Sequence, residues 1–158
     1  MYLLLKAIHV LAVVMFVGNI TTGVFWKAHA DKTRDPRLIA HALDGIIRSD
    51  RIFTVPGVFL ILAAGVTAAI VGDLPLLGTG WIFWPIVLFS ISGIAFMARV
   101  APLQRQMLDI ARAGGAGQMN WMRYESLSRS WAIWGAIALL TPLAALFIMV
   151  MKPALPGL

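Results

Sequence analysis

Four apolar windows dominate this sequence and leave few folds open to it. They cover residues 3–26, 53–71, 81–100 and 131–151. Each window can cross about 30 Å of hydrocarbon as a helix that rises about 1.5 Å per residue. The composition agrees, because 60% of the residues are hydrophobic and only 13% are charged, whereas about 25% are charged in soluble domains. The sequence therefore predicts a single integral membrane domain over residues 1–158.

The connections between the windows have a helical pattern of their own. In residues 35–53, apolar side chains recur at spacings of three and four, behind Asp35 as a predicted N-cap and Pro36 in the first turn. The segment after the third window runs on helically to a predicted stop at Gly114 and Gly115. We therefore predict an all-α fold, a four-transmembrane-helix antiparallel bundle with helices extending into the cytoplasm.

The basic residues predict how the bundle is oriented. Eleven of the thirteen Lys and Arg residues lie in the connections that follow the first and third windows or, in the case of Arg99, at the very end of the third window, and the remaining two are Lys6 and Lys152. Basic segments resist translocation and stay in the cytoplasm. The sequence thus predicts a multi-pass protein of the bacterial inner (cytoplasmic) membrane with both termini periplasmic.

The same charge distribution argues against nucleic acid as a partner. The net charge of +6 at pH 7 is placed around membrane windows, and the chain contains no groove-reading motif. It also contains no cysteine, which excludes disulfides, thiolate metal sites and Fe–S clusters. The expected partners are the lipid bilayer and either a second copy of the chain or a membrane redox partner.

One ionisable ring, that of His9, lies inside the first apolar window. Ala12, Phe16, Asn19 and Gly23 lie on or beside the same helical face at about 100° per residue. Ionisable groups inside a membrane usually face the bundle interior and mark functional sites. We therefore expect this face of the first helix to be shielded from lipid.

Small residues are expected at the depth of His9. That depth is about 10 Å below the outer end of the first helix, and it falls near Gly65 and Ala68 in the second window and Ala145 in the fourth. Such residues leave room for a flat cofactor, or they let helices approach closely. The residues alone allow three interpretations of His9: a structural imidazole bonded to a carbonyl or hydroxyl, a haem ligand, and a copper or proton-relay site.

A second iron ligand is not obvious from the sequence. His29 and His41 belong to the predicted cytoplasmic side, while Met149 and Met151 lie at the outer end of the fourth window. Methionines at such positions usually face the core or lipid, so methionine ligation has weak support.

Lys6 and Lys152 are the only basic residues predicted on the outer side. They can snorkel to lipid phosphate, or they can pair with the propionates of a bound haem.

Several stretches resemble a known family. They are "YLLLKAIHVLAVVMFVG", "RIFTVPGVFLILAAG", "RVAPLQRQM" and "FIMVMKP", and they are similar to a large family of bacterial integral membrane proteins known chiefly as a numbered domain of unknown function. More distantly, the chain resembles the HemJ-type protoporphyrinogen oxidases, and it is weakly similar to CopD-type copper proteins and PuuD-type urate oxidases. In the HemJ type the first-span histidine binds haem b.

The resemblance implies that His9 binds haem iron, with a redox or electron-transfer role for the protein. The alternative is a non-enzymatic membrane scaffold, a partner subunit or a copper-handling protein, in which His9 is structural.

The HemJ resemblance does not extend to the other functional groups of those oxidases. They carry a lysine in a Trp-x-x-x-Lys pattern early in the third span, where this chain reads "WIFWP" and has Pro85. Their Asn-Glu pair before the last span also has no counterpart in "AIWGAIALLTP". Removing hydrogens from a porphyrinogen requires groups that accept protons. We therefore do not expect protoporphyrinogen oxidase activity, and the residues leave open another haem-dependent oxidoreductase activity.

Reporter fusions test the predicted topology. A fusion after Thr79 should report the periplasm, and a fusion after Gly115 should report the cytoplasm, because only the second of these connections carries basic residues. Paired alkaline phosphatase and fluorescent-protein activities would measure this. If both fusions reported the same compartment, the four-span topology would be wrong.

Overall fold

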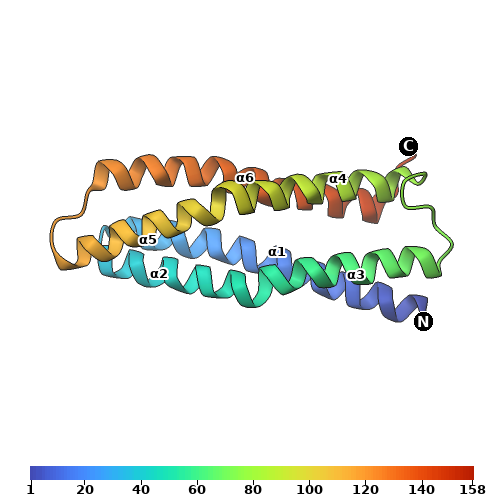
Figure 1. Cartoon of the computed structure of the whole chain (residues 1–158), viewed down its shortest axis with the longest axis horizontal. Helices are drawn as coiled ribbons and strands as arrows, with labels where there is room; N and C mark the ends of the chain where they lie inside the picture. The colour runs from blue at the N-terminus through green and yellow to red at the C-terminus, as the bar shows by residue number, and fades with distance from the viewer.

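The chain folds as four long antiparallel helical rods (Figure 1), in a computed structural model that describes all residues 1–158. The first rod is α1 (Tyr2–Thr33) and the last is α6 (Trp121–Met151). The second rod comprises α2 (Pro36–Ser49), the π-helix η1 (Asp50–Thr54) and α3 (Val55–Val71). The third comprises α4 (Gly80–Ala95), the π-helix η2 (Phe96–Val100) and α5 (Ala101–Ala116). The predicted all-α four-helix bundle is confirmed.

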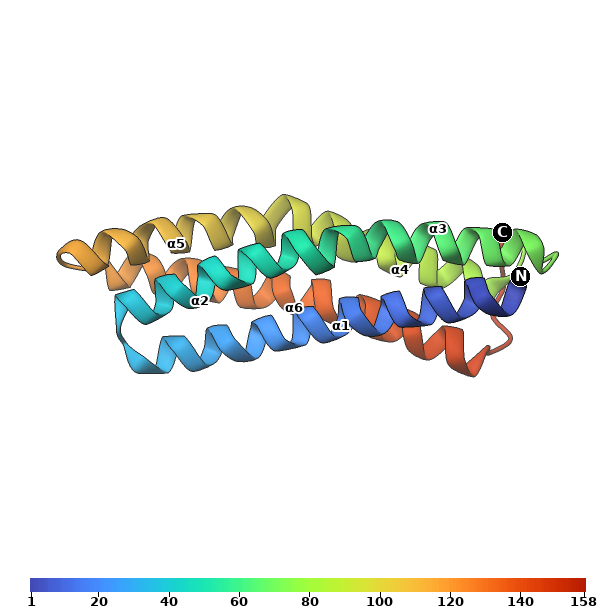
Figure 2. The same cartoon turned by 90° about the horizontal axis from the view of Figure 1, so that it is seen from below.

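All four rods are long and apolar enough to cross a membrane, at 32, 36, 37 and 31 residues. About 20 residues suffice for the hydrocarbon core, so every rod extends beyond it. Both termini lie at one end of the bundle, and the α1–α2 and α5–α6 connections lie at the other (Figures 1 and 2). We call the half of the bundle that carries the termini the outer half and the opposite half the inner half.

The start of α2 follows the predicted capping pattern. The carboxylate of Asp35 accepts a hydrogen bond from the backbone N–H of Arg37 at 2.8 Å, and Pro36 occupies the first helical position. This satisfies one of the N–H groups that a helix start leaves without a partner.

The predicted stop after the third window lies slightly too early. Helix α5 continues through Gly114 and Gly115 to Ala116. Gly114 serves a packing purpose there, since a Cβ at this position would lie 2.7 Å from the Cβ of Met119. The glycine therefore lets the α5–α6 connection fold back against the helix.

The four rods pack differently in the two halves. In the inner half α2 packs on α5, α1 on α2, and α5 on α6, around a core that includes Ile39, Leu43, Met107 and Ala111. In the outer half α1 packs along α3, and α4 packs along α6. Helix α3 makes no close backbone contact with α4 or α6. The outer half therefore consists of two helix pairs, α1–α3 and α4–α6.

A buried polar cluster lies where the two halves meet. The Asp50 side chain, in a residue only 8% exposed, accepts hydrogen bonds from Asn19 Nδ2 at 3.2 Å and from Thr54 Oγ1 at 2.9 Å. Gln104 Nε2 donates to the second carboxylate oxygen at 3.2 Å. These bonds join α1, the second rod and the third rod, and they satisfy a carboxylate that would otherwise be costly to bury.

Both π-helices lie just before a proline. Thr54 ends η1 two residues before Pro56, and Val100 ends η2 two residues before Pro102. A proline lacks an N–H, and its ring clashes with the carbonyl four residues earlier in a regular α-helix. The wider π-turn accommodates this clash, so both rods continue through their prolines.

Pro142 lies inside α6 and makes possible a hydrogen bond between that helix and α4. Because its nitrogen carries no hydrogen, the carbonyl of Ala138 loses its usual helical partner. Ser92 Oγ, on α4, donates a hydrogen bond to this carbonyl at 2.6 Å. The proline thus creates the acceptor through which α4 and α6 are joined.

Replacing Ser92 with alanine should destabilise the protein by about 1–3 kcal/mol, because the Ala138 carbonyl is then buried without a partner. Ser90→Ala is the matched control, since the Ser90 hydroxyl is exposed and bonds only to Ile86 O of its own helix. The free energy of unfolding, measured by denaturant titration in detergent, would compare them. Equal stability of the two variants would contradict this role for Ser92.

Candidate functional site

A cavity of about 520 Å³ separates the two helix pairs in the outer half. Ligand-binding cavities in proteins commonly measure about 300–1,000 Å³. Most of its lining is apolar, and the side chains in it that carry polar atoms are Tyr2, Lys6, His9, Trp81 and Lys152. The structure therefore brings the three residues singled out in the sequence, Lys6, His9 and Lys152, to a single cavity.

The half-buried imidazole of His9 is held by one hydrogen bond across the α1–α3 pair. Its Nδ1 lies 2.9 Å from the carbonyl oxygen of Ile61. A carbonyl oxygen can only accept, so Nδ1 carries the proton. In the neutral ring Nε2 then keeps its lone pair, and no hydrogen bond from the protein engages this nitrogen.

Gly65 provides the space for this ring. A Cβ at residue 65 would lie 2.8 Å from His9 Nδ1 and 2.9 Å from its Cε1. Gly65 follows Ile61 by one helical turn, so the same stretch of α3 provides both the acceptor and the room. The predicted alignment of His9 with Gly65 is therefore confirmed.

Two apolar residues on the predicted inward face of α1 are the most deeply buried of that face. Ala12 and Phe16 are buried, whereas His9, Asn19 and Gly23 are half-buried. The ring centroid of Phe16 lies 5.4 Å from that of Phe89 on α4, and both rings line the cavity. This contact between the two helix pairs places an aromatic wall on the inner side of the cavity.

Two cations lie at the outer rim of the cavity. Lys6 is exposed on α1, and Lys152 is the exposed C-cap residue of α6. The Nζ of Lys152 lies 4.7 Å from the ring centroid of Trp81, within cation–π range. Neither lysine forms an ion pair, so both remain available to an anionic group.

Met149 also lines this cavity, although methionine ligation had weak support in the sequence analysis. It follows Pro142 by seven residues and Ala145 by four, and both of these residues line the cavity too. Such spacings mark one face of a helix. Met151, in contrast, is 62% exposed and lies outside the lining. The helical phase along α6 was the signal that could have separated the two methionines.

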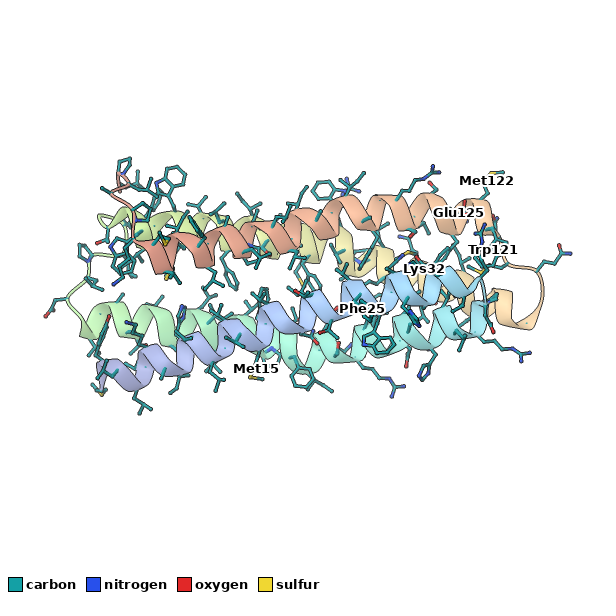
Figure 3. All side chains as sticks on the ribbon, turned by 180° about the vertical axis from the view of Figure 1, so that it is seen from behind. Met15, Phe25, Lys32, Trp121, Met122 and Glu125 are labelled. Carbon is teal, nitrogen blue, oxygen red and sulfur yellow. The ribbon has the colours of Figure 1, made fainter.

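The other two histidines lie away from the cavity. His29 packs beside the rings of Phe25 and Trp26, with centroid distances of 6.2 and 5.8 Å. Figure 3 shows Phe25 toward the end of α1 where Lys32, Trp121 and Glu125 gather. His41 is exposed on α2. Their predicted separation from His9 is confirmed.

Two charged residues are buried that the sequence analysis did not single out. One is Asp50, in the polar cluster between the two halves. The second is Lys27, which is 4% exposed and whose Nζ lies 2.5 Å from Asp31 Oδ2 and 2.6 Å from Ser128 Oγ. The hydroxyl of Tyr124 donates to the other carboxylate oxygen of Asp31 at 2.6 Å. This cluster joins α1 to α6 in the inner half and lies outside the cavity lining.

The Gly65→Ala variant should lose about 1–3 kcal/mol of stability, because the added methyl group displaces the His9 ring from Ile61. Gly18→Ala on α1 is the control, since a Cβ there meets nothing within 4 Å. We expect Gly18→Ala to keep wild-type stability or gain up to about 1 kcal/mol from its higher helix propensity. Denaturant titration in detergent would measure both, and a neutral Gly65→Ala would contradict the close approach of α3 to His9.

Comparison with known proteins gives one match. The family model described as "Predicted integral membrane protein (DUF2269)" matches residues 3–153. No curated protein and no solved structure matches the chain. The four apolar rods agree with the family description. Since the match spans nearly the whole chain, this integral membrane protein belongs to the DUF2269 family.

Proposed function

We propose that this protein binds haem b in the cavity between the two helix pairs, with His9 as the ligand to the iron and a redox or electron-transfer role. One observation carries the proposal. The bond between His9 Nδ1 and the Ile61 carbonyl leaves Nε2 as the ring nitrogen available to a ligand in the cavity.

The donor set of the cavity suits haem. An axial histidine is a common haem ligand, and a metal-ligating imidazole usually donates its other N–H to a carbonyl or carboxylate, which fixes the tautomer and the ring orientation. Ile61 provides that carbonyl, and Gly65 leaves the space for the ring. Lys6 and Lys152 would pair with the two propionates at the outer rim.

The remaining lining would orient the ligand and exclude water. Side chains such as Val13, Ile82 and Phe89 present apolar surface to the cavity, and Phe16 and Phe89 contact each other on its inner side. A flat apolar macrocycle is compatible with such walls. When bound, haem b would supply one-electron chemistry, while the protein sets the polarity and the ligand field around it.

Porphyrinogen oxidation is not part of this proposal. The cavity lining contains no carboxylate, and Pro85 lines the cavity where the HemJ pattern has a lysine. The proton acceptors that such a reaction requires are therefore missing from the lining. The resemblance to the HemJ type therefore supports only haem binding by the first-span histidine, and not the oxidase activity.

The proposed location is the bacterial inner membrane, with both termini periplasmic. Eleven of the thirteen basic residues lie within residues 27–51 or 99–129, which favours a cytoplasmic inner half. Lys6 and Lys152 would then lie near the periplasmic headgroups. A membrane redox partner or a second copy of the chain would meet the protein within the bilayer.

The absorbance of the purified protein tests haem binding. Wild type from haem-replete cells should show a Soret band, and His9→Ala should bind hemin at least about 10-fold more weakly, since even loss of an outer-shell partner costs that much in metal sites. His41→Ala is the control, because His41 is exposed outside the cavity. Soret absorbance per protein, checked by the pyridine haemochrome, would measure this.

Two results would overturn the proposal. One is a colourless wild type that takes up no added hemin, and the other is a full Soret band in His9→Ala. His9 would then be structural, and the protein would be a scaffold, a partner subunit or a copper-handling protein. Copper analysis of the same samples would separate the last of these from the others.

A further inference from the structure

Met149 and His9 line one cavity from opposite helix pairs, since Met149 belongs to α6 and His9 to α1. We infer that Met149 supplies the second axial ligand to the haem iron. This inference rests on the proposed haem-binding function. Its support is the depth of Met149, its place on the helix face, and the chemistry of the other groups in the cavity.

Two contacts between helices fix the relative depth of these residues. The rings of Phe16 on α1 and Phe89 on α4 have centroids 5.4 Å apart, so these residues lie at similar depths. The hydrogen bond of 2.6 Å from Ser92 Oγ to the Ala138 carbonyl does the same for α4 and α6. Together they relate α1 to α6 through α4.

Counting outward from these contacts brings His9 level with Met149. His9 lies seven residues outward of Phe16, which is about 10 Å of helix. The same step from Phe89 leads to Ile82, which is ten residues outward of Ser92. Ten residues outward of Ala138 is position 148, directly before Met149. The two residues therefore lie within about one 5.4 Å helical turn of the same depth.

A third contact agrees with this alignment. Lys152 follows position 148 by four residues, and its Nζ lies 4.7 Å from the ring of Trp81, the neighbour of Ile82. Helical side chains lean toward the N-terminus of their helix, which for α6 is the inner end. The long Lys152 side chain therefore reaches back by about a turn, as the contact requires.

Met149 lies on the face of α6 that lines the cavity. The α6 residues in the lining are Pro142, Ala145, Leu146, Met149 and Val150. Their spacings of three, four and seven belong to one helical face. Met149 is half-buried there, whereas the side chain of Met151 lies on the exposed side of the helix.

No other side chain on the wall opposite His9 offers a lone pair to iron. Met149 contributes a sulfur atom to the cavity lining of the α4–α6 pair. The other side chains of this pair that line the cavity and carry a nitrogen or oxygen atom are Trp81 and Lys152. The indole nitrogen of tryptophan is only a donor of hydrogen and does not ligate iron. The Lys152 side chain lies over the Trp81 ring as an ammonium group, which can attract an anion but has no lone pair for iron.

The remaining polar groups belong to the wall that holds His9. Lys6 lies on α1, one turn from His9. The Tyr2 ring packs against α3, where a Cβ on Gly72 would lie 3.0 Å from it. The thioether of Met149 is thus the donor placed to face His9 across the cavity, and histidine with methionine is an established axial pair for haem iron that raises its reduction potential.

The test compares Met149→Leu with Met151→Leu, each loaded with hemin in detergent. Wild type should show a six-coordinate low-spin spectrum by electron paramagnetic resonance and resonance Raman. Met149→Leu should still bind hemin through His9 but lose the low-spin signal, bind carbon monoxide readily when reduced, and have a lower midpoint potential. Met151→Leu should match wild type, because that side chain lies outside the cavity.

A third variant distinguishes the loss of an iron ligand from a general loss of structure in Met149→Leu. Met149→His should restore a low-spin spectrum, now with two nitrogen ligands, if residue 149 faces the iron. A high-spin wild type, or a low-spin signal that survives in Met149→Leu, would overturn this inference while haem binding through His9 stands. A wild type that binds no hemin would overturn the proposed function, and the role of Met149 with it.

Discussion

The core of a bilayer provides no water to hydrogen-bond polar groups, so a polar group that the protein leaves unsatisfied there carries a high free-energy cost. Regular helices satisfy most of the backbone N–H and C=O groups. Several of the polar groups that they leave without a partner are satisfied by side chains, often from a neighbouring rod. Pro142 frees the Ala138 carbonyl, which Ser92 then binds. The carboxylate of Asp50 is buried and is satisfied by three side chains from two other rods and its own. Each exception produces a contact between rods.

The bond between His9 and Ile61 belongs to the same series. It satisfies an imidazole N–H inside the apolar region by using the second lone pair of a helix carbonyl. It also determines which ring nitrogen is left for a ligand. A structural histidine needs only this bond, whereas a ligating histidine needs this bond and a cavity beside the ring. The cavity between the helix pairs is therefore what favours a ligand.

The cavity depends on the difference between the two halves. In the inner half the α2–α5, α1–α2 and α5–α6 contacts, together with the buried Lys27 cluster, bind the rods to one another. In the outer half α3 can therefore stay apart from α4 and α6 without the bundle separating. Packing in the inner half thus stabilises an arrangement that leaves a cavity between the helix pairs of the outer half.

Much of this could be predicted from the sequence, because a membrane helix has a simple signature of length, apolar content and phase. The four rods, the cap at Asp35 and the alignment of His9 with Gly65 followed from these. The cluster at Asp50 and the position of Met149 did not. They depend on how one rod is aligned with another, and that alignment is set by contacts between residues distant in the chain, such as Ser92 with Ala138.

The tautomer of His9 tests the central claim most directly, namely that Nδ1 is held by Ile61 and Nε2 is left for a ligand. Nitrogen-15 NMR of the ligand-free protein, with His29 and His41 replaced by glutamine, would report this ring alone at a pH where it is neutral. We predict a proton on Nδ1 and an unprotonated Nε2. A neutral ring with its proton on Nε2 would contradict the account, because the lone pair would then point at the Ile61 carbonyl.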